Sequence, residues 1–339
     1  MIIPYFSRKK SNSIIVNQLT DLQAIISKEI DQLEFPLHPV DLYEPIKYIL
    51  SIGGKRMRPA LLLMACDLFG GDMLKAVPPA LAIEVFHNFT LVHDDIMDNA
   101  PLRRARATVH EKWNRNVAIL SGDVMLVESY KLLMQVEDRL LRPVITVFND
   151  TAVGVCEGQQ TDMDFETRND VHIDEYIVMI RLKTAVLLGG ALKIGAIIGG
   201  ADDHDASLLQ TFGEQLGIAF QLQDDILDVY GNPENFGKQV GGDILSNKKT
   251  YLLIKALETA NAAQSTELKK WFSGTDFPAK EKIDAVTAIY DRLNIRQHAW
   301  QAMRLYADKA FAVLDEVDLP ADRKKYLHDF ATGLMIREN

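Results

Sequence analysis

Apolar residues recur every three or four positions along most long segments of this chain of 339 residues. In the first clear case, Leu19, Leu22, Ile26 and Ile30 recur at this interval, which places them on one face of an α-helix. Strand-like alternation is scarce. Turn signals such as "SIGGKRMRP" and "YGNPENFGKQVGGD" separate the helical segments, and none resembles a long flexible linker. The sequence therefore predicts a single all-α domain over residues 1–339.

The composition excludes several classes of protein. An apolar fraction of 47% and a charged fraction of 25% describe a well-packed globular chain. A net charge of −10 without a long basic block gives no support for binding nucleic acid. The longest apolar region, residues 185–200, is shorter than a bilayer span and is interrupted by Lys193. We expect it to form a buried helix, without stable insertion into a membrane.

The cysteines and the N-terminal segment favour a cytoplasmic protein. Cys66 and Cys156 are the only cysteines, and their wide separation fits neither a zinc knuckle nor a disulfide framework. The N-terminal stretch "MIIPYFSRKK" places its apolar residues before its basic ones, which is the reverse of a secretory signal.

An acidic pentapeptide occurs twice, as "DDIMD" at 94–98 and as "DDILD" at 224–228, each time after apolar residues at helical spacing. Residues four positions apart share a helix face, so each copy presents a pair of carboxylates. Like charges at this spacing disfavour an exposed helix by roughly 0.2–0.5 kcal/mol, and partial burial increases the repulsion. Magnesium is commonly held by one or two carboxylates together with substrate phosphates. The two pairs therefore predict a metal site that binds a diphosphate.

Two basic clusters accompany the acidic pairs. Arg103 and Arg104 follow the first pair, and the stretch "GGKRMRP" at 53–59 sets basic residues beside two glycines. Guanidinium groups match phosphate oxygens, and glycine lets backbone N–H groups approach an anion. Each cluster alone also fits surface salt bridges and a tight turn. Together with the acidic pairs, they predict a reaction in which a metal-held diphosphate leaves while a second diphosphate is held by basic residues.

Five separated motifs support a more specific interpretation: "GGKRMRP", "DDIMD" followed by "RR", "EGQQTD", "KT", and "FQLQDDILD" followed by "GK" and "GGDILSNKK". With these motifs the chain resembles the trans-type isoprenyl diphosphate synthases, or polyprenyl synthetases, over about residues 50–250. The resemblance implies the isoprenoid synthase fold, a multi-helix bundle around a deep central active-site cavity. It also implies a homodimer and a transferase that uses magnesium, with three ions per active site and manganese able to substitute.

The resemblance assigns roles to individual residues. The metal site would comprise Asp94, Asp98, Asp224 and Asp228. Supporting residues would be Asp95, Asp225, Gln159 and Asp162. The allylic diphosphate would be bound by Arg103, Lys183, Lys238 and Lys248. Isopentenyl diphosphate would be bound by Gly54, Lys55, Arg58, His87 and Arg104. The catalytic residues at the breaking C–O bond would be Lys183, Thr184 and Gln221.

Three of these residues have plain structural alternatives. His87 would also suit a buried histidine that is satisfied by a backbone carbonyl. Lys183 would also suit a side chain that extends from a helix into solvent. Gln159 would also suit an ordinary polar position on a helix.

The residues before the first acidic pair bear on product length. In the family, side chains one or two turns before this pair limit chain growth, and here they are Phe86, Phe89 and Thr90. An aromatic residue five positions before Asp94 resembles the short-chain enzymes and argues against products of C30 and longer. The substrates would be isopentenyl diphosphate with dimethylallyl, geranyl or farnesyl diphosphate. The pattern predicts geranylgeranyl diphosphate (C20) as the product, with farnesyl diphosphate (C15) as the second candidate.

Other functions remain in competition. A terpene cyclase normally mixes Asn, Ser or Thr with Glu in its second metal motif, so "DDILD" and "GGKRMRP" favour coupling. A di-iron bundle would use Glu84 and His87, but the chain has no second pair of this spacing. A non-catalytic synthase subunit would be expected to lose acidic or basic motifs, and none is missing. The glycine-containing stretch 229–249 is expected to be a mobile loop that closes over the bound diphosphate and excludes water.

Overall fold

The computed structural model describes residues 19–231, 240–273 and 277–335. Its first half contains α1 (Leu19–Asp31), α2 (Val40–Ser51), α3 (Met57–Leu68), α4 (Met73–Met97), β1 (Leu102–Arg103), β2 (Arg106–Ala107), α5 (Val109–Lys112), α6 (Arg115–Leu133) and α7 (Asp138–Thr167). There follow α8 (Ile173–Ile180), the π-helix η1 (Arg181–Ala185), α9 (Val186–Gly199), α10 (Asp203–Tyr230), α12 (Gly242–Leu245), α13 (Tyr251–Thr259), α14 (Ala262–Ser273), α15 (Ala279–Arg292), α16 (Ile295–Glu316) and α17 (Ala321–Met335). The all-α prediction is confirmed.

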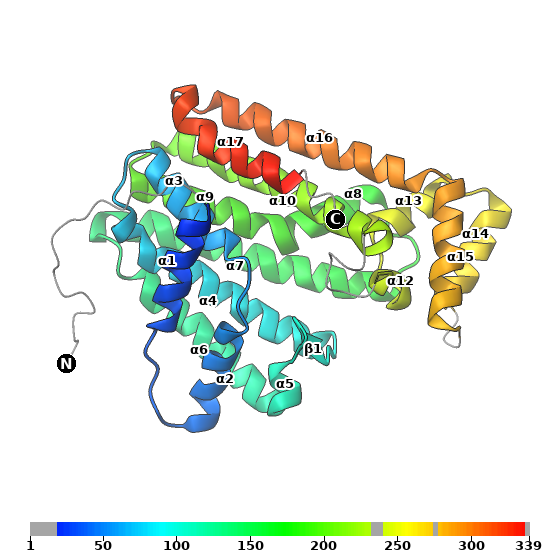
Figure 1. The fold of residues 1–339 in the computed structure, drawn as a ribbon, viewed down its shortest axis with the longest axis horizontal. Coiled ribbons are helices and arrows are strands. Elements are labelled where there is room, and N and C mark those ends of the chain that lie inside the picture. Colours follow the sequence, from blue (N-terminus) through cyan, green and yellow to red (C-terminus); the bar gives the residue numbers. More distant parts are fainter. Residues whose placement is uncertain (1–18, 232–239, 274–276, 336–339) are drawn as a thin grey trace.

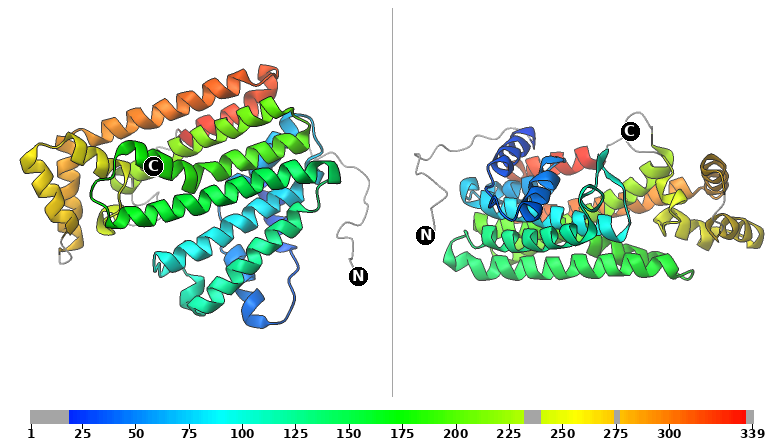
Figure 2. Two further views of the ribbon diagram at one scale, coloured as in Figure 1. Left: turned by 180° about the vertical axis from the view of Figure 1, so that it is seen from behind. Right: turned by 90° about the horizontal axis from the view of Figure 1, so that it is seen from below.

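The long helices lie side by side in a layered bundle. Figures 1 and 2 show α4, α7, α9, α10 and α16 running along the molecule, with α14 and α15 crossing at one end. None of the described helices is both long enough and apolar enough to cross a bilayer.

Helix α9 lies at the centre of this bundle. It packs against α3, α4, α7 and α10, and most of its residues are buried. A helix with apolar residues on all sides requires neighbours on all sides. The prediction of a buried helix over 185–200 is therefore confirmed.

The buried apolar residues form two clusters that share α10. Leu209, Phe212 and Leu216 in its first half belong to a cluster with α1 to α7, α9 and α17. Ile218, Leu222 and Ile226 in its second half belong to a cluster with α8, η1 and α12 to α16, and with Phe165 near the end of α7. Helix α10 therefore connects both halves of the core, and its second half carries the second acidic pair.

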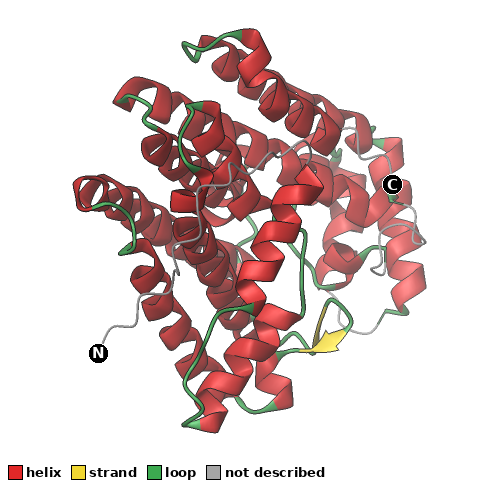
Figure 3. Cartoon of the chain, turned by 60° about the vertical axis from the view of Figure 1, so that its left-hand side comes forward, coloured by secondary structure: helices red, strands yellow, loops and turns green. Residues whose placement is uncertain are grey.

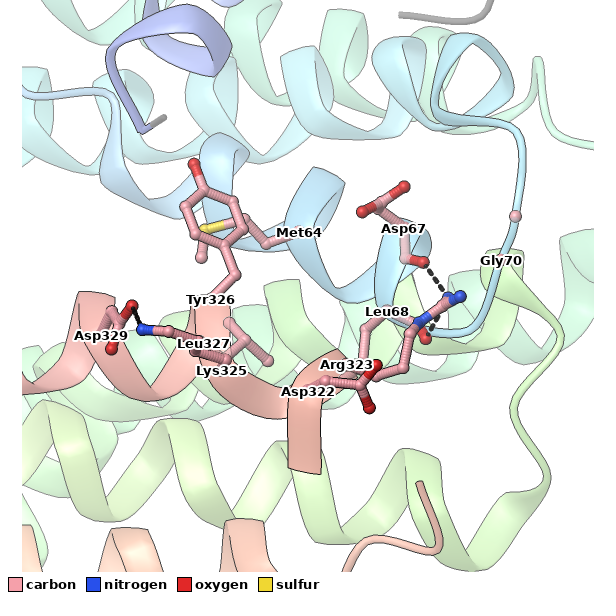
Figure 4. A pocket seen from close by; sticks show the side chains of 11 residues that line it. Met64, Asp67, Leu68, Gly70, Asp322, Arg323, Lys325, Tyr326, Leu327 and Asp329 are labelled. Atoms are coloured by element: carbon pink, nitrogen blue, oxygen red, sulfur yellow. Dashed lines mark hydrogen bonds and ion pairs between the residues drawn. The ribbon is translucent and has the colours of Figure 1, made fainter. Parts of the chain in front are cut away.

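Helix α17 closes the bundle against α3. The Arg323 guanidinium donates hydrogen bonds to the backbone carbonyls of Asp67 and Leu68, at 2.8 and 2.7 Å (Figure 4). The last carbonyls of a helix have no intrahelical partner, and Arg323 supplies one for each of these two.

A small β-hairpin interrupts the helices directly after α4 (Figure 3), although strand patterning is scarce in the sequence. Arg103 pairs with Arg106 across the hairpin, and the two residues between them, Arg104 and Ala105, have φ angles of 50° and 61°. Positive φ at both central positions defines a tight turn whose twist suits a hairpin. The turn holds the Arg103 and Arg104 backbone in a fixed conformation next to the first acidic pair.

Candidate active site

Most of the residues predicted from sequence meet in one cavity of about 360 Å³ between α4, α7, η1 and α10. The predicted residues that line it are Arg58, His87, Thr90, Asp94, Arg103, Gln159, Lys183, Thr184, Gln221, Asp224, Asp228 and Lys248. The sequence had not indicated the acidic Asp243 or the apolar lining residues Leu91, Val155, Leu187 and Phe220. The cavity thus combines acidic, basic and apolar walls.

The first acidic pair lies at the end of α4. Asp98 caps this helix, and its backbone N–H donates to the Asp94 carbonyl at 2.8 Å, so the two carboxylates are one turn apart. Burial raises the pKa of Asp94 to about 6; the Asp98 carboxylate adds to this shift and Lys183 opposes it. A helix C-terminus carries partial negative charge, which further disfavours carboxylates there.

The second acidic pair, Asp224 and Asp228, lies in the last two turns of α10. Asp224 and Asp228 line the same cavity as Asp94. The backbone N–H of Asp243 donates to Asp228 Oδ2 at 3.0 Å and ties α12 to this pair. Two helices therefore bring their negative C-terminal ends and their carboxylates to one cavity.

The middle aspartates of the two motifs are buried and bind protein groups. Asp95 accepts hydrogen bonds from Nε and Nη2 of Arg103, at 2.8 and 2.7 Å. Asp225 accepts from the Tyr176 hydroxyl, the Gln221 amide and the Tyr251 backbone N–H. Burial raises the pKa of Asp225 to about 7, with Asp243 adding to the shift. These contacts suit residues that position their neighbours.

Lys183 and Thr184 lie in the π-helix η1, which the sequence did not predict. Such widened turns occur often at functional sites. Gly158 of α7 packs directly on this turn, since a Cβ atom there would lie 2.2 Å from the Lys183 backbone nitrogen. The glycine in the motif "EGQQTD" is the feature of the sequence that could have indicated this close contact. Gly158 allows α7 to contact the backbone of η1, which carries Lys183 and Thr184.

The polar side chains of this wall form two hydrogen-bonded groups. Lys183 Nζ donates to Asp162 Oδ2 at 2.6 Å. Thr184 Oγ1 donates to Gln221 Oε1 at 3.3 Å, and Gln221 Nε2 donates to Asp225 Oδ1 at 3.1 Å. The candidate residues of η1 are thus fixed from α7 and from α10. Lys183 is ion-paired, which contradicts the alternative that it merely extends into solvent.

The basic wall is centred on Arg58 and His87. Arg58 Nη1 lies 3.2 Å from His87 Nε2. A guanidinium only donates, so His87 Nε2 accepts and the neutral imidazole carries its proton on Nδ1. Burial, together with Arg58 and Arg104, holds the pKa of His87 well below its usual range. Arg104 lies against Gly54, where a Cβ atom would come within 2.5 Å of its Nη1.

A buried ion pair between Arg56 and Glu84 supports this wall, and the sequence did not indicate it. Only 6% of Arg56 and 3% of Glu84 are exposed. Arg56 also donates to the Leu50 carbonyl, and Asn88 donates to Glu84 Oε1 at 3.1 Å. Burial lowers the pKa of Arg58 and of Arg104, and Glu84 opposes both shifts. Because Glu84 is occupied by Arg56 and Asn88, it is a poor iron ligand.

Not every predicted residue lines the cavity. Of the three expected to form its floor, only Thr90 is among the described lining residues. Phe86 and Phe89 pack instead in an aromatic cluster, where Phe86 lies 5.1 Å from Phe148 and Phe89 lies 4.7 Å from His93 between ring centres. The periodicity fixes neither the rotation of α4 nor the neighbours of these rings.

The predicted diphosphate-binding residues Gly54, Lys55 and Arg104 are not among the described residues that line the cavity. Lys55 follows Gly54 on an exposed turn, and its carbonyl accepts from the Gln23 amide. Lys238 and the middle of the expected closing loop, residues 232–239, fall outside the described residues.

The donor set fits a divalent cation that is bound together with a diphosphate. Within the described residues, no three His, Cys, Asp or Glu side chains gather closely enough to hold a metal by themselves. Carboxylates on separate helices suit magnesium, which takes its remaining ligands from substrate oxygens and water. Gln159 Oε1, buried without a partner among the described residues, also lies on this cavity and can accept a hydrogen bond from such a water.

The fold and the site define a helical enzyme of the isoprenoid synthase type. Residues 39–290 match the polyprenyl synthetase family, and the chain belongs to that family. It is 40% identical to a geranylgeranyl diphosphate synthase of Methanosarcina mazei over 72% of this chain and 76% of the relative. It is 37% identical to the enzyme of the same name from Sulfolobus acidocaldarius over 93% and 95% of the two chains.

Solved structures agree with this assignment. A crystal structure of a geranylgeranyl pyrophosphate synthase superimposes with a TM-score of 0.91 at 44% identity, covering 96% of this chain and all of that one. The predicted family and fold are therefore confirmed.

We expect Gly158→Ala to disturb η1 and with it Lys183. The added methyl group must displace backbone, so the free energy of unfolding should fall by about 1–3 kcal/mol. Turnover should fall at least about tenfold, because a tenfold loss needs only about 1.4 kcal/mol. Urea denaturation and steady-state kinetics measure both effects. Gly154→Ala is the matched control, since a Cβ atom there meets Val186 at an ordinary 3.5 Å. Equal activity of the two variants would contradict this role of Gly158.

We also expect Asp94→Asn to stabilise the metal-free protein while abolishing activity. Burial raises the pKa of Asp94 from 3.8 to about 6, so folding loses stability as pH rises through this range. The variant should exceed the wild type by roughly 1–2 kcal/mol near pH 8, and this difference should vanish below about pH 4. Denaturation in the presence of a chelator tests the effect. A difference that does not depend on pH would refute the electrostatic cause.

Proposed function

We propose that the chain is a short-chain trans-prenyltransferase that condenses isopentenyl diphosphate with allylic diphosphates and releases geranylgeranyl diphosphate. The observation that carries this proposal is the meeting, in one cavity, of carboxylates from both acidic motifs, Asp94, Asp224 and Asp228, with cationic side chains. The names of the relatives support the C20 product. Farnesyl diphosphate is the second candidate product.

We propose that magnesium is bound by Asp94, Asp98, Asp224 and Asp228. Magnesium, when bound, would neutralise the leaving diphosphate and weaken the bond between its oxygen and the allylic carbon. The raised pKa of Asp94 supports the proposal, because burial disfavours its charge by more than Lys183 and Arg103 stabilise it.

The allylic diphosphate would lie against Arg103, Lys183 and Lys248. All three line the cavity beside the acidic pairs. Asp95 holds the Arg103 fork in place, and Asp162 holds the Lys183 ammonium. As the C–O bond breaks, its electron pair leaves with the diphosphate. The oxygens of Thr184 and Gln221, which line the same cavity, would stabilise the resulting allylic cation through their dipoles.

Isopentenyl diphosphate would lie against Arg58, His87 and Arg104. Because His87 is neutral, it would donate from Nδ1 to a phosphate oxygen and would not titrate. The isopentenyl double bond attacks the allylic cation and forms the new C–C bond. The intermediate then loses a proton, and the departing diphosphate is the base. This step restores a double bond and leaves a longer allylic diphosphate.

The growing chain would occupy the apolar wall formed by Leu91, Val155, Leu187 and Phe220. The aromatic cluster of Phe86, Phe89 and Phe148 would limit its length from α4 and α7. Phe86 and Phe148 are almost completely buried, so they resist displacement by a longer chain.

We further propose a homodimer in the cytoplasm. The exposed side of α6 carries Ile119, Leu120 and Val127, which are 42%, 58% and 56% exposed. Apolar residues close together on one helix face suit contact with a second copy.

The purified protein, incubated with magnesium, labelled isopentenyl diphosphate and farnesyl diphosphate, should yield a C20 product. The double variant Asp94→Ala, Asp224→Ala should retain its fold by circular dichroism and lose at least about a thousandfold in turnover, since it removes charge stabilisation worth several kcal/mol. Chromatography of the dephosphorylated products measures the product length and the turnover. Full turnover by the folded double variant, or by wild type in a chelator, would refute the proposed mechanism.

Phe89→Ala should lengthen the product beyond C20, because it opens the aromatic cluster from the α4 side. Mass spectrometry of the products from farnesyl diphosphate provides the measurement. Phe165→Ala is the control, because this buried ring belongs to the other half of the core. An unchanged product distribution in Phe89→Ala would place the limit elsewhere.

A further inference from the structure

A second cavity, of about 580 Å³, lies beyond the end of α7 and between α13 and α14. Figures 1 and 2 show these two helices at one end of the bundle. Its lining residues are Glu166, Thr167, Asn169, Val171, Asn247, Lys249, Leu253, Ile254, Leu257, Leu268, Lys269, Phe272 and Ser273. None of them lines the catalytic cavity. Its volume is in the usual range of small-molecule sites.

One wall of this cavity is apolar. Ile254 and Leu268 are buried members of the second core cluster, and Leu253 of α13 is also buried. Leu257 and Phe272 are only partly buried against that cluster, so their side chains have surface left for a ligand. A hydrocarbon chain that occupied the cavity would remove this surface from water, which favours binding in proportion to the area covered.

The cavity also carries cationic charge. Lys249 and Lys269 face a single acidic lining residue, Glu166, in a chain whose net charge is −10. Burial lowers the pKa of Lys249, and Glu166 opposes the shift. Within the described residues, neither ammonium has a hydrogen-bond acceptor. An anionic group next to Lys249 would offset the unfavourable burial of its ammonium charge. The amides of Asn169 and Asn247 supply further hydrogen-bond donors.

The cavity is joined to the catalytic site by three consecutive residues. Asn247 and Lys249 line the second cavity, whereas Lys248 between them lines the catalytic cavity, near Asp98, Asp162 and Asp243. Asn247 has a φ of 58°, and its side chain accepts from Lys282 of α15. A ligand that draws Lys249 toward itself must therefore act on the backbone that carries Lys248.

We propose that this cavity is a regulatory site for a second long-chain prenyl diphosphate, the product of the enzyme, an inference that rests on the proposed function. The partly exposed side chains of Leu257 and Phe272, with the buried Leu253, Ile254 and Leu268 behind them, take the hydrocarbon chain, and Lys249 and Lys269 take the diphosphate. Binding shifts Lys248 away from the allylic diphosphate and lowers turnover. No bond is made or broken in this step.

Initial rates with added geranylgeranyl diphosphate test the proposal. The wild type should show inhibition with a component that saturating allylic substrate does not remove. In the double variant Lys249→Gln, Lys269→Gln the affinity responsible for this component should fall at least about tenfold, which corresponds to a loss of about 1.4 kcal/mol in binding free energy. Its kcat and KM without added product should stay within about twofold of wild type. Lys255→Gln with Lys270→Gln is the matched control, since these lysines lie on α13 and α14, the two helices beside the cavity, but do not line it.

Two further ligands separate the parts of the site. Geranylgeraniol has the hydrocarbon without the charge, and inorganic diphosphate has the charge without the hydrocarbon. Neither should reproduce the effect at the concentration at which the intact product does. Equal inhibition of the wild type and the Lys249, Lys269 variant, or inhibition that is fully competitive in both, would overturn the proposal.

Hydrogen exchange gives a readout that does not depend on turnover. Geranylgeranyl diphosphate should slow exchange in residues 251–273 of the wild type and of the control, but not of the Lys249, Lys269 variant. Slowed exchange in a protein that makes no prenyl diphosphate would overturn the proposed function and leave the amphiphile site standing. Active enzyme without this protection would overturn the site and leave the function standing.

Discussion

The structure depends on the placement of like charges at the ends of two helices. Helices α4 and α10 both finish at the catalytic cavity, so their carboxylates lie where the helix dipoles are already negative. Only a well-packed bundle can impose this arrangement, and α9, buried between the two helices and their neighbours, supplies the packing. The cationic side chains on the same cavity reduce the repulsion without removing it. This arrangement supports the proposal that the site binds cations together with a diphosphate.

The basic wall also gathers like charges, here the positive charges of arginine side chains. Arg58 and Arg104 lie near each other and near a neutral histidine, and one buried carboxylate, that of Glu84, offsets their charge. Glu84 is held by Arg56 and Asn88, so it cannot turn toward the cavity. Breaking such a buried pair typically costs about 3–5 kcal/mol because it leaves a charge uncompensated. The wall thus stays cationic toward a ligand while the fold tolerates the charge.

Local spacing predicted the helices, the two acidic pairs and the buried helix around residues 185–200, because each depends on residues within a few turns. The π-helix could not be predicted in this way, since it depends on the approach of Gly158 from α7. The hairpin after α4 depends on positive φ angles at Arg104 and Ala105, which are not residues that usually announce such a turn. The places of Phe86 and Phe89 depend on how α4 is rotated against α7, which the pattern of α4 alone leaves open.

The ion pair between Lys183 and Asp162 has a consequence for the order of events in the site. In the proposed reaction, the diphosphate does not meet a free cation at Lys183. It has to take the ammonium from the carboxylate of Asp162, which is already in contact with it. The net gain is therefore the difference between two ion pairs, which is smaller than either. When the diphosphate departs, Asp162 can take Lys183 back, so departure leaves no bare charge behind. An affinity limited in this way suits an enzyme that has to release the diphosphate after every elongation.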